Sequence, residues 1–156
     1  MRNRQKGFSL IELLIVVAII LIIAAIAIPN LLRSKIAANQ ASAVGSMRSL
    51  NTACIAYYTS YGSFPTALTN LGPVGSSGTA SSTSADLIDS VLSAGTKSGY
   101  TFVYSPGSLN QSYSITASPV TAATTGQNMY YTDQSGVIRS DTSGTGAGSA
   151  STPIGN

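Results

Sequence analysis

Apolar residues fill the first part of the chain almost without interruption. Between residues 8 and 28 every side chain is apolar except those of Ser9 and Glu12, and Pro29 follows. At the α-helical rise of about 1.5 Å per residue, this stretch is roughly 30 Å long, which matches the thickness of a bilayer core. The pattern predicts a hydrophobic helix over residues 8–29 that can cross a membrane.

After Pro29 the hydrophobic pattern becomes one-sided. Apolar residues recur at steps of three, four and seven, which is typical of one helical face, while polar residues take the other face. The apolar positions are Leu32, Ile36, Ala43, Met47, Leu50, Cys54, Tyr57 or Tyr58, and Tyr61. The pattern predicts an amphipathic helix over residues 30–61 that ends before Gly62 and packs its apolar side on a globular head.

Residues 62–98 are rich in Gly, Pro and Ser and lack a sustained period, which predicts loops and short helices. One short helical turn is expected within Pro65–Leu71. Another helix is expected from Ala85 to about Ser93, with Ser84 as its N-cap.

From residue 99 to residue 141 the hydrophobic period changes to two, which predicts an antiparallel sheet of three or four strands. The strand candidates are Tyr100–Tyr104, Tyr113–Ala117, Gln127–Thr132 and Val137–Arg139, the last one after a turn at Asp133–Gly136. Residues 142–156 are rich in Ser, Gly and Thr and predict a flexible tail. The chain is therefore expected to be an α+β protein, in which the C-terminal half of a long N-terminal helix packs on the sheet.

The positive charge of the chain is concentrated ahead of the hydrophobic helix. Arg2, Arg4 and Lys6 account for the whole net charge of +3, because five basic and five acidic residues remain without them. Under the positive-inside rule these residues hold the N-terminus in the cytoplasm and direct the rest of the chain outward. No basic patch remains to contact phosphates, so the sequence does not support nucleic-acid binding.

The residue types exclude several catalytic sites. The chain has no histidine and one cysteine, so neither a Ser-His or Cys-His pair nor a histidine zinc site can be built, and we expect no enzyme activity. Cys54 lies on the apolar helical face and is expected to be buried, with no internal disulfide. Asp133 and Asp141 are candidate calcium ligands, with carbonyls of the turn residues between them. The simpler interpretation makes Asp133 a turn residue and Asp141 a solvated carboxylate.

Glu12 is the unusual residue of the hydrophobic helix. An ionised carboxylate at mid-bilayer costs about 2.5–3.5 kcal/mol, so Glu12 is expected to have a partner. If the chain is cut after Gly7, the new amine of Phe8 lies four residues before Glu12. The two opposite charges can then neutralise each other within or between chains. The alternative is a glutamate that stays at the level of the lipid headgroups.

The N-terminal segment closely resembles that of a known family. Residues 7–20 read GFSLIELLIVVAII and residues 24–29 read AAIAIP. This run is similar to the class III signal and N-terminal helix of type IV pilins and type II secretion pseudopilins. The resemblance implies that a prepilin peptidase cleaves after Gly7, removing residues 1–7, and N-methylates Phe8. It also implies that Glu12 pairs with the N-terminus of a neighbouring subunit, and it leaves Pro29 as the evident helix breaker.

The resemblance implies a pilin-like fold and a structural function. Subunits would wait in the inner membrane until an assembly machinery packs them into a homo-oligomeric extracellular filament, a type IV pilus used in adhesion or motility. A pseudopilin of a type II secretion system, in a periplasmic pseudopilus, is the first alternative, and some major pseudopilins bind calcium. A soluble secreted protein cleaved after Ala27 is the second alternative, because Ala25–Ala27 fits an ordinary signal-peptide site.

Overall fold

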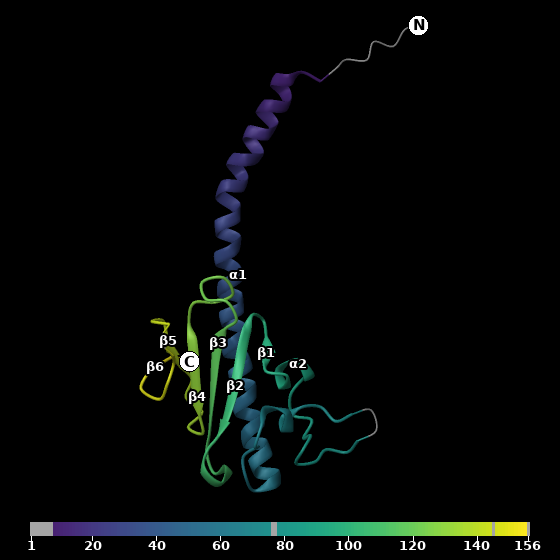
Figure 1. The fold of residues 1–156 in the computed structure, drawn as a ribbon, viewed down its shortest axis with the longest axis vertical. Coiled ribbons are helices and arrows are strands. Elements are labelled where there is room, and N and C mark those ends of the chain that lie inside the picture. The colour runs from purple at the N-terminus through teal and green to yellow at the C-terminus, as the bar shows by residue number, and fades with distance from the viewer. Residues whose placement is uncertain (1–7, 76–77, 145, 156) are drawn as a thin grey trace. The chain divides into compact units, whose positions relative to one another are not determined.

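The computed structural model describes residues 8–75, 78–144 and 146–155 and divides the chain into two compact units. The N-terminal unit is Met1–Lys35, and the second unit, called the head below, is Ile36–Asn156. Helix α1 spans Leu10–Tyr61 and contributes to both units (Figure 1). The long N-terminal apolar helix and the α+β fold class expected from the sequence are confirmed.

Pro29 lies inside α1 rather than at its end. A proline in a helix removes one backbone donor, so its neighbours have to support the helix in other ways. The side chain of Asn30 donates to the carbonyl of Ile26 at 3.0 Å, and Ser34 Oγ donates to the carbonyl of Asn30 at 3.0 Å. The first of these side-chain bonds spans the proline position, and the second lies in the turn that follows it. The predicted hydrophobic and amphipathic helices therefore form one element, and Pro29 does not break it.

The head contains a six-stranded antiparallel sheet in which consecutive strands are neighbours (Figure 1). The strands are β1 Thr96–Lys97, β2 Tyr100–Pro106, β3 Tyr113–Pro119, β4 Met129–Asp133, β5 Arg139–Asp141 and β6 Thr152–Pro153. The predicted strands correspond to β2, β3, β4 and β5, although β5 begins at Arg139 rather than at Val137. The edge strands β1 and β6 were not predicted, because two residues are too few to show an alternating pattern.

Strand β6 corrects the expectation of a flexible tail over residues 142–156. Arg139 and Ser140 of β5 pair with Pro153 and Thr152. The backbone nitrogen of Ile154 also donates to the carbonyl of Ile138 at 2.9 Å, and Ile154 packs against the core. Ile154, the residue after β6, thus anchors this edge strand to the core.

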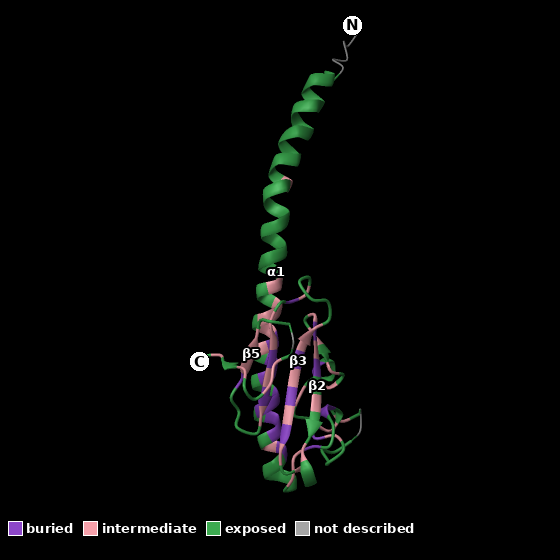
Figure 2. Cartoon of the chain, turned by 60° about the vertical axis from the view of Figure 1, so that its left-hand side comes forward, coloured by how far each residue is buried: buried purple, intermediate pink, exposed green. Residues whose placement is uncertain are grey.

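The core lies between the C-terminal half of α1 and one face of the sheet, where Figure 2 shows the buried residues. Strand β3 alternates buried and half-buried residues over Tyr113–Pro119, as the period of two predicts. The helix contributes Ala43, Met47, Leu50, Ala53, Cys54 and Tyr57, and the sheet contributes Tyr100, Phe102, Tyr113, Ile115, Ala117 and Tyr130. The middle of the predicted stripe, from Ala43 to Tyr57, is therefore buried as expected, whereas Leu32 and Tyr61 at its ends are exposed.

The connection from α1 to the sheet contains shorter helices than predicted. The expected turn within Pro65–Leu71 is the 3₁₀ helix η1, Leu68–Leu71, and a second one, η2, spans Ser108–Asn110. Helix α2 covers only Ser90–Ser93, and its N-cap is Asp89, whose carboxylate accepts the backbone nitrogen of Leu92 at 2.9 Å. The prediction of a helix from Ala85 capped by Ser84 was wrong.

The backbone conformation explains why α2 starts late. The backbone nitrogens of Ala85, Asp86 and Leu87 donate to carbonyls of residues 70–72, which ties this segment to the preceding loop. Asp86 also has φ +56°, which no right-handed helix accommodates. The Ser84 hydroxyl donates to the carbonyl of Pro73 at 2.7 Å instead of capping a helix.

Gly126 is a position where the head has no room for a side chain. A Cβ atom there would lie 2.6 Å from Cζ of Tyr100, a fully buried ring whose hydroxyl donates to the carbonyl of Asn128 at 2.9 Å. We expect Gly126→Ala to destabilise the head by about 1–3 kcal/mol, the usual cost of overpacking a filled core. Thermal unfolding of the full chain in detergent, followed by circular dichroism, measures this.

Gly45 supplies the control for that substitution. It lies in α1, and no atom is within 4 Å of the Cβ that an alanine would place there. We expect Gly45→Ala to stabilise the head by roughly 0.5–1 kcal/mol through helix propensity alone. If both alanine variants shift the unfolding temperature in the same direction, the packing of Tyr100 against Gly126 is not what distinguishes them.

Candidate functional site

The main candidate site is the apolar surface of α1 in the N-terminal unit. Its most apolar 18-residue window has a mean hydropathy of 3.3, and none of its residues is buried. Leu10 exposes 78% of its surface and Ile20 exposes 57%. Exposed apolar surface costs about 25 cal/mol per Å² in water, and a helix that is apolar on all sides is stable only in an apolar environment. This helix is long and apolar enough to cross a membrane or to pack among similar helices.

Glu12 is held at the beginning of this helix. Its Oε2 atom accepts the backbone nitrogen of Ser9 at 2.8 Å, and Ser9 directly precedes the first helical residue, Leu10. This is the half of a capping box in which the acid in the first turn bonds back to the N-cap backbone. The carboxylate is therefore placed one residue from Phe8, which is 78% exposed.

The predicted processing site is described only in part. Gly7 lies outside the described residues, as do Arg2, Arg4 and Lys6. Phe8 precedes α1 and has an exposed side chain. Cleavage after Gly7, methylation of Phe8 and pairing of Glu12 with a neighbouring N-terminus remain predictions.

The structure does not bring the two candidate calcium ligands together. Asp141 of β5 pairs with Met129, four residues before Asp133 on β4. At about 3.3 Å per strand residue, the two aspartates lie roughly 13 Å apart. Asp133 Oδ1 accepts the backbone nitrogen of Ser135 at 2.9 Å, and Asp141 Oδ1 accepts that of Ser143 at 2.8 Å. Within the described ranges there is also no group of three or more His, Cys, Asp or Glu residues that suits a metal, so the residues do not fit a shared calcium ion.

Cys54 is buried in the core as a free thiol. Burial raises its pKa to about 12, so it stays protonated at neutral pH. A thiol that is neither ionised nor accessible is a poor nucleophile. The interpretation of Cys54 as a small core residue is therefore consistent with its surroundings.

Buried tyrosines make the head sensitive to alkali. Burial raises the pKa of Tyr100 to about 12, and burial followed by the influence of Cys54 raises the pKa values of Tyr104 and Tyr113. In the unfolded chain tyrosine ionises near pH 10. Between about pH 10 and 12 the unfolded state therefore loses protons that the folded state keeps, so the free energy of unfolding decreases as the pH rises.

We expect the free energy of unfolding to decrease slightly between pH 7 and pH 9, because Cys54 ionises at about pH 8.5 only in the unfolded chain, and to decrease steeply in the range of about pH 10–12, where the head unfolds. Urea unfolding followed by circular dichroism at several pH values measures this. Tyr104→Phe, which removes one of these groups, should give a shallower dependence on pH. A free energy of unfolding that stays constant up to about pH 12 would contradict the argument.

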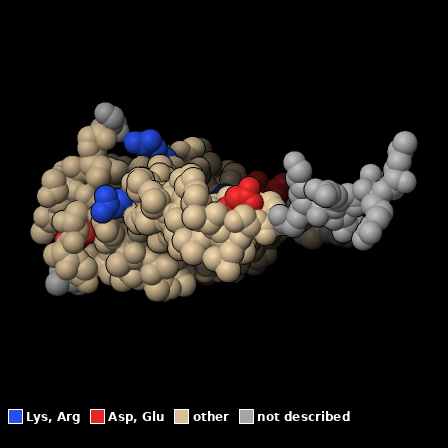
Figure 3. Space-filling model, turned by 90° about the horizontal axis from the view of Figure 1, so that it is seen from above, with Lys and Arg blue, Asp and Glu red and all other residues tan. Residues whose placement is uncertain are grey.

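The charged side chains of the head are few and separate. On the face of the chain shown in Figure 3, charged side chains form isolated spots on an otherwise uncharged surface. Among the described residues, the only salt bridge joins Lys97 Nζ and Asp89 Oδ2 at 2.8 Å. Arg139 donates from a terminal guanidinium nitrogen to the carbonyl of Ser151 at 3.2 Å.

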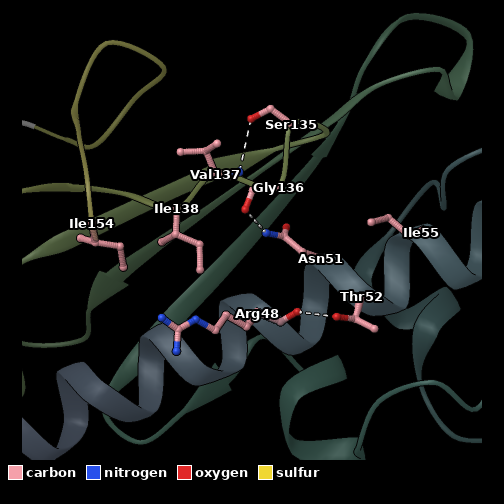
Figure 4. A pocket seen from close by; sticks show the side chains of 9 residues that line it. All are labelled: Arg48, Asn51, Thr52, Ile55, Ser135, Gly136, Val137, Ile138 and Ile154. Atoms are coloured by element: carbon pink, nitrogen blue, oxygen red, sulfur yellow. Dashed lines mark hydrogen bonds between the residues drawn. The ribbon is translucent and has the colours of Figure 1, made fainter. Parts of the chain in front are cut away.

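An open groove of about 560 Å³ lies beside the second half of α1. Figure 4 shows Arg48, Asn51, Thr52 and Ile55 of the helix on one side and the segment after β4 on the other. Sequence reasoning missed this groove, since its walls come from segments about 85 residues apart. Two signals were present: Ile55 is an apolar residue off the buried stripe, and Val137–Ile138 is an apolar pair after a turn.

Comparisons with known proteins agree on the N-terminal part of the chain. Residues 2–28 match the family model of the prokaryotic N-terminal methylation motif. The type IV major pilin protein of Myxococcus xanthus is 52% identical over 50 residues, which are 32% of this chain and 23% of that protein. The type IV wide pilus major component of Thermus thermophilus is 67% identical over 39 residues, which are 25% of this chain and 29% of that protein.

A relative from the secretion branch matches a longer segment. The type II secretion system core protein G of Aeromonas hydrophila is 35% identical over 65 residues, which are 42% of this chain and 46% of that protein. The chain thus spans about a quarter to a half of the length of these relatives. No solved structure gives a significant match. The similarity of the N-terminal segment to type IV pilins and type II secretion pseudopilins is confirmed.

Proposed function

We propose that this chain is a structural subunit of a type IV pilus-like filament, built by lateral packing of N-terminal helices. The observation that carries the proposal is the fully exposed apolar surface of α1 in the segment that matches the methylation motif. Such a surface is satisfied by lipid before assembly and by neighbouring apolar helices afterwards. The names of the pilus relatives support the same role.

The subunit has no catalytic task in this proposal. The chain lacks histidine, and its one cysteine is a buried thiol with a raised pKa. The head fills its interior with apolar and tyrosine side chains from α1 and the sheet. Its role is to give the filament a folded outer surface.

In this proposal, Arg2, Arg4 and Lys6 keep the N-terminus of the precursor in the cytoplasm, and the head lies on the other side of the inner membrane. A prepilin peptidase removes residues 1–7 and methylates Phe8. An inner-membrane assembly machinery then moves the subunit into an extracellular pilus. Glu12 meets the new N-terminus of a neighbour, which compensates both charges within an apolar surrounding.

A pseudopilin function is the second candidate. The match to core protein G covers 42% of this chain, more than either pilus relative covers. The same helix packing would then build a periplasmic pseudopilus of a type II secretion system. The two candidates differ in where the assembled subunit is found.

Mass spectrometry of the N-terminal peptide tests these candidates when it is applied separately to sheared extracellular filaments and to washed membranes. A methylated Phe8 terminus abundant in the sheared fraction supports a pilus subunit. The same terminus confined to membranes supports a pseudopilin. A terminus at Ile28 would overturn both, because the exposed apolar helix would then be absent from the mature protein.

A further inference from the structure

A second open groove, of about 510 Å³, lies on the head between α1 and the segment that contains α2. Its α1 side consists of Ser42, Gly45, Ser46 and Ser49, and residues 87–92 and Lys97 of β1 form the rest. Every side chain that α1 contributes here is small, and no atom lies within 4 Å of the Cβ position of Gly45. A ligand in this groove can therefore approach the helix closely.

Ser46 is the unusual residue of this groove. It exposes only 7% of its surface, yet its hydroxyl forms no hydrogen bond with any residue that the structure describes. Other hydroxyls of α1 donate to the carbonyl four residues earlier, among them Ser49 to Gly45 at 3.2 Å and Thr52 to Arg48 at 3.1 Å. A nearly buried hydroxyl without a partner is destabilising and rare. Because Ser46 lines the groove, a ligand there would supply the missing partner.

The polar groups around Ser46 suit a neutral ligand that carries hydroxyl groups. Asp89 and Lys97 form a salt bridge of 2.8 Å at the groove, so their charges cancel. Their side chains are 49% and 35% exposed, and each has bonding capacity left for a ligand: the carboxylate accepts hydrogen bonds and the ammonium donates them. The hydroxyls of Ser46 and Ser49 do both. A ligand whose groups both donate and accept, as hydroxyls do, matches this set.

The wall opposite α1 adds apolar surface. Leu87 lines the groove and is 39% exposed, and Leu92 beside it is buried. A sugar ring has the same two-sided character, with hydroxyls at its edge and C–H groups on its face. Adjacent ring hydroxyls are spaced much like the carboxylate of Asp89 and the ammonium of Lys97, so one can donate to the first while the next accepts from the second. The donor and the acceptor of a peptide unit point in opposite directions, which suits this pair less well.

We propose that this groove of the head binds a neutral sugar. Ser46, Ser49, Asp89 and Lys97 are its hydrogen-bonding groups, and Leu87 lies against the face of the ring. The volume of the groove is within the range of small-molecule sites, roughly 300–1,000 Å³. The site adds a ligand to the head and does not depend on the proposed filament function.

Titration of the isotope-labelled full chain with glucose tests the proposal, in micelles of a zwitterionic detergent that contains no sugar. Changes in amide NMR shifts should be confined to the residues around the groove, with half-saturation at about 1–10 mM, as for a ligand held by a few hydrogen bonds on an open surface. Ser46→Ala should weaken binding about three- to tenfold, because one hydrogen bond is lost. Ser49→Leu should abolish binding, since the leucine side chain fills the groove.

Ser60→Ala is the matched control. Ser60 is an exposed serine of the same helix that lies outside the groove and donates to the Ala56 carbonyl at 3.1 Å, so this variant should bind glucose as the unaltered chain does. Circular dichroism separates binding from folding. Ser46→Ala should have an unchanged or higher unfolding temperature, because it removes a hydroxyl that has no partner. A lower unfolding temperature would show a structural role for this hydroxyl and contradict the proposal.

Two other results would also contradict a sugar site. One is the absence of shift changes up to about 100 mM glucose, well above the expected half-saturation, and the other is an equal affinity of Ser46→Ala and the unaltered chain. N-methylacetamide, which mimics a peptide bond, serves as the comparison ligand. If it shifts the residues around the groove and glucose does not, the groove is a peptide site and the proposal is wrong. Each of these outcomes leaves the proposed filament function untouched.

Discussion

Replacing Glu12 with alanine is expected to lower filament yield by about a hundredfold or more while the chain still inserts into the membrane. Removing one member of a buried ion pair costs about 3–5 kcal/mol, because the other charge remains without a partner. In the proposed filament that other charge is the amine of Phe8 on a neighbouring subunit. Membrane insertion does not suffer, since the substitution takes a carboxylate out of an apolar segment.

Glu12→Gln separates the two roles that the carboxylate can have. The amide oxygen of glutamine can still accept the backbone nitrogen of Ser9, as Oε2 does at 2.8 Å, but it carries no charge. If charge pairing directs assembly, glutamine fails as alanine does. The measurement compares the subunit in sheared filaments with the subunit in membranes by immunoblotting. Glu12→Ala filaments at normal yield would show that this carboxylate does not set the subunit register.

Elements in which a hydrophobic pattern persists over many residues were predictable from the sequence. The two halves of α1 follow from an unbroken apolar run and from a stripe at helical spacing, and the stripe residues Met47, Leu50 and Cys54 are buried. Strands β2 and β3 follow from the alternation of aromatic and small residues. The turn at Asp133–Gly136 is confirmed by the bond from the Gly136 nitrogen to the Asp133 carbonyl at 2.9 Å. Each of these signals depends on local spacing, which the sequence displays directly.

The features that sequence reasoning missed depend on contacts between distant segments. The helix expected from Ala85 does not form, because Asp86 adopts φ +56° where residues 85–87 bond to residues 70–72. Strand β6 forms because residues 152–153 pair with residues 139–140. Asp133 and Asp141 looked close in sequence, but antiparallel pairing places them at opposite ends of a hairpin. Periodicity carries no information on such pairings. The prediction errors therefore concern loops, edge strands and sites formed by several segments.

Asn51 connects the helix, the sheet and the wall of the groove. Its side chain is nearly buried, and its amide nitrogen donates to Thr132 Oγ1 at 2.9 Å and to the Gly136 carbonyl at 3.2 Å. Its amide oxygen accepts the hydroxyl of Tyr113 at 3.1 Å. Thr132 and Tyr113 are themselves buried, so their hydroxyls depend on this amide. The sequence placed Asn51 on the polar face of the helix and gave no sign of the network.

Asn51→Ala is therefore expected to destabilise the head by roughly 3–5 kcal/mol, because each buried polar group left without a partner costs about 1–3 kcal/mol. Urea unfolding of the full chain in detergent, followed by circular dichroism, measures the loss. Asn39→Ala is the matched control: Asn39 is half-buried on the same helix and makes one bond, to the Thr125 carbonyl at 2.8 Å, so its loss should cost about 1 kcal/mol.

Equal effects of the two alanine variants would show that the Asn51 amide is not the centre of the network. A larger effect of Asn51→Ala would show that the amide holds the sheet and the turn on the helix together, because its bond to the Gly136 carbonyl also fixes the turn before Val137, which lines the groove beside α1.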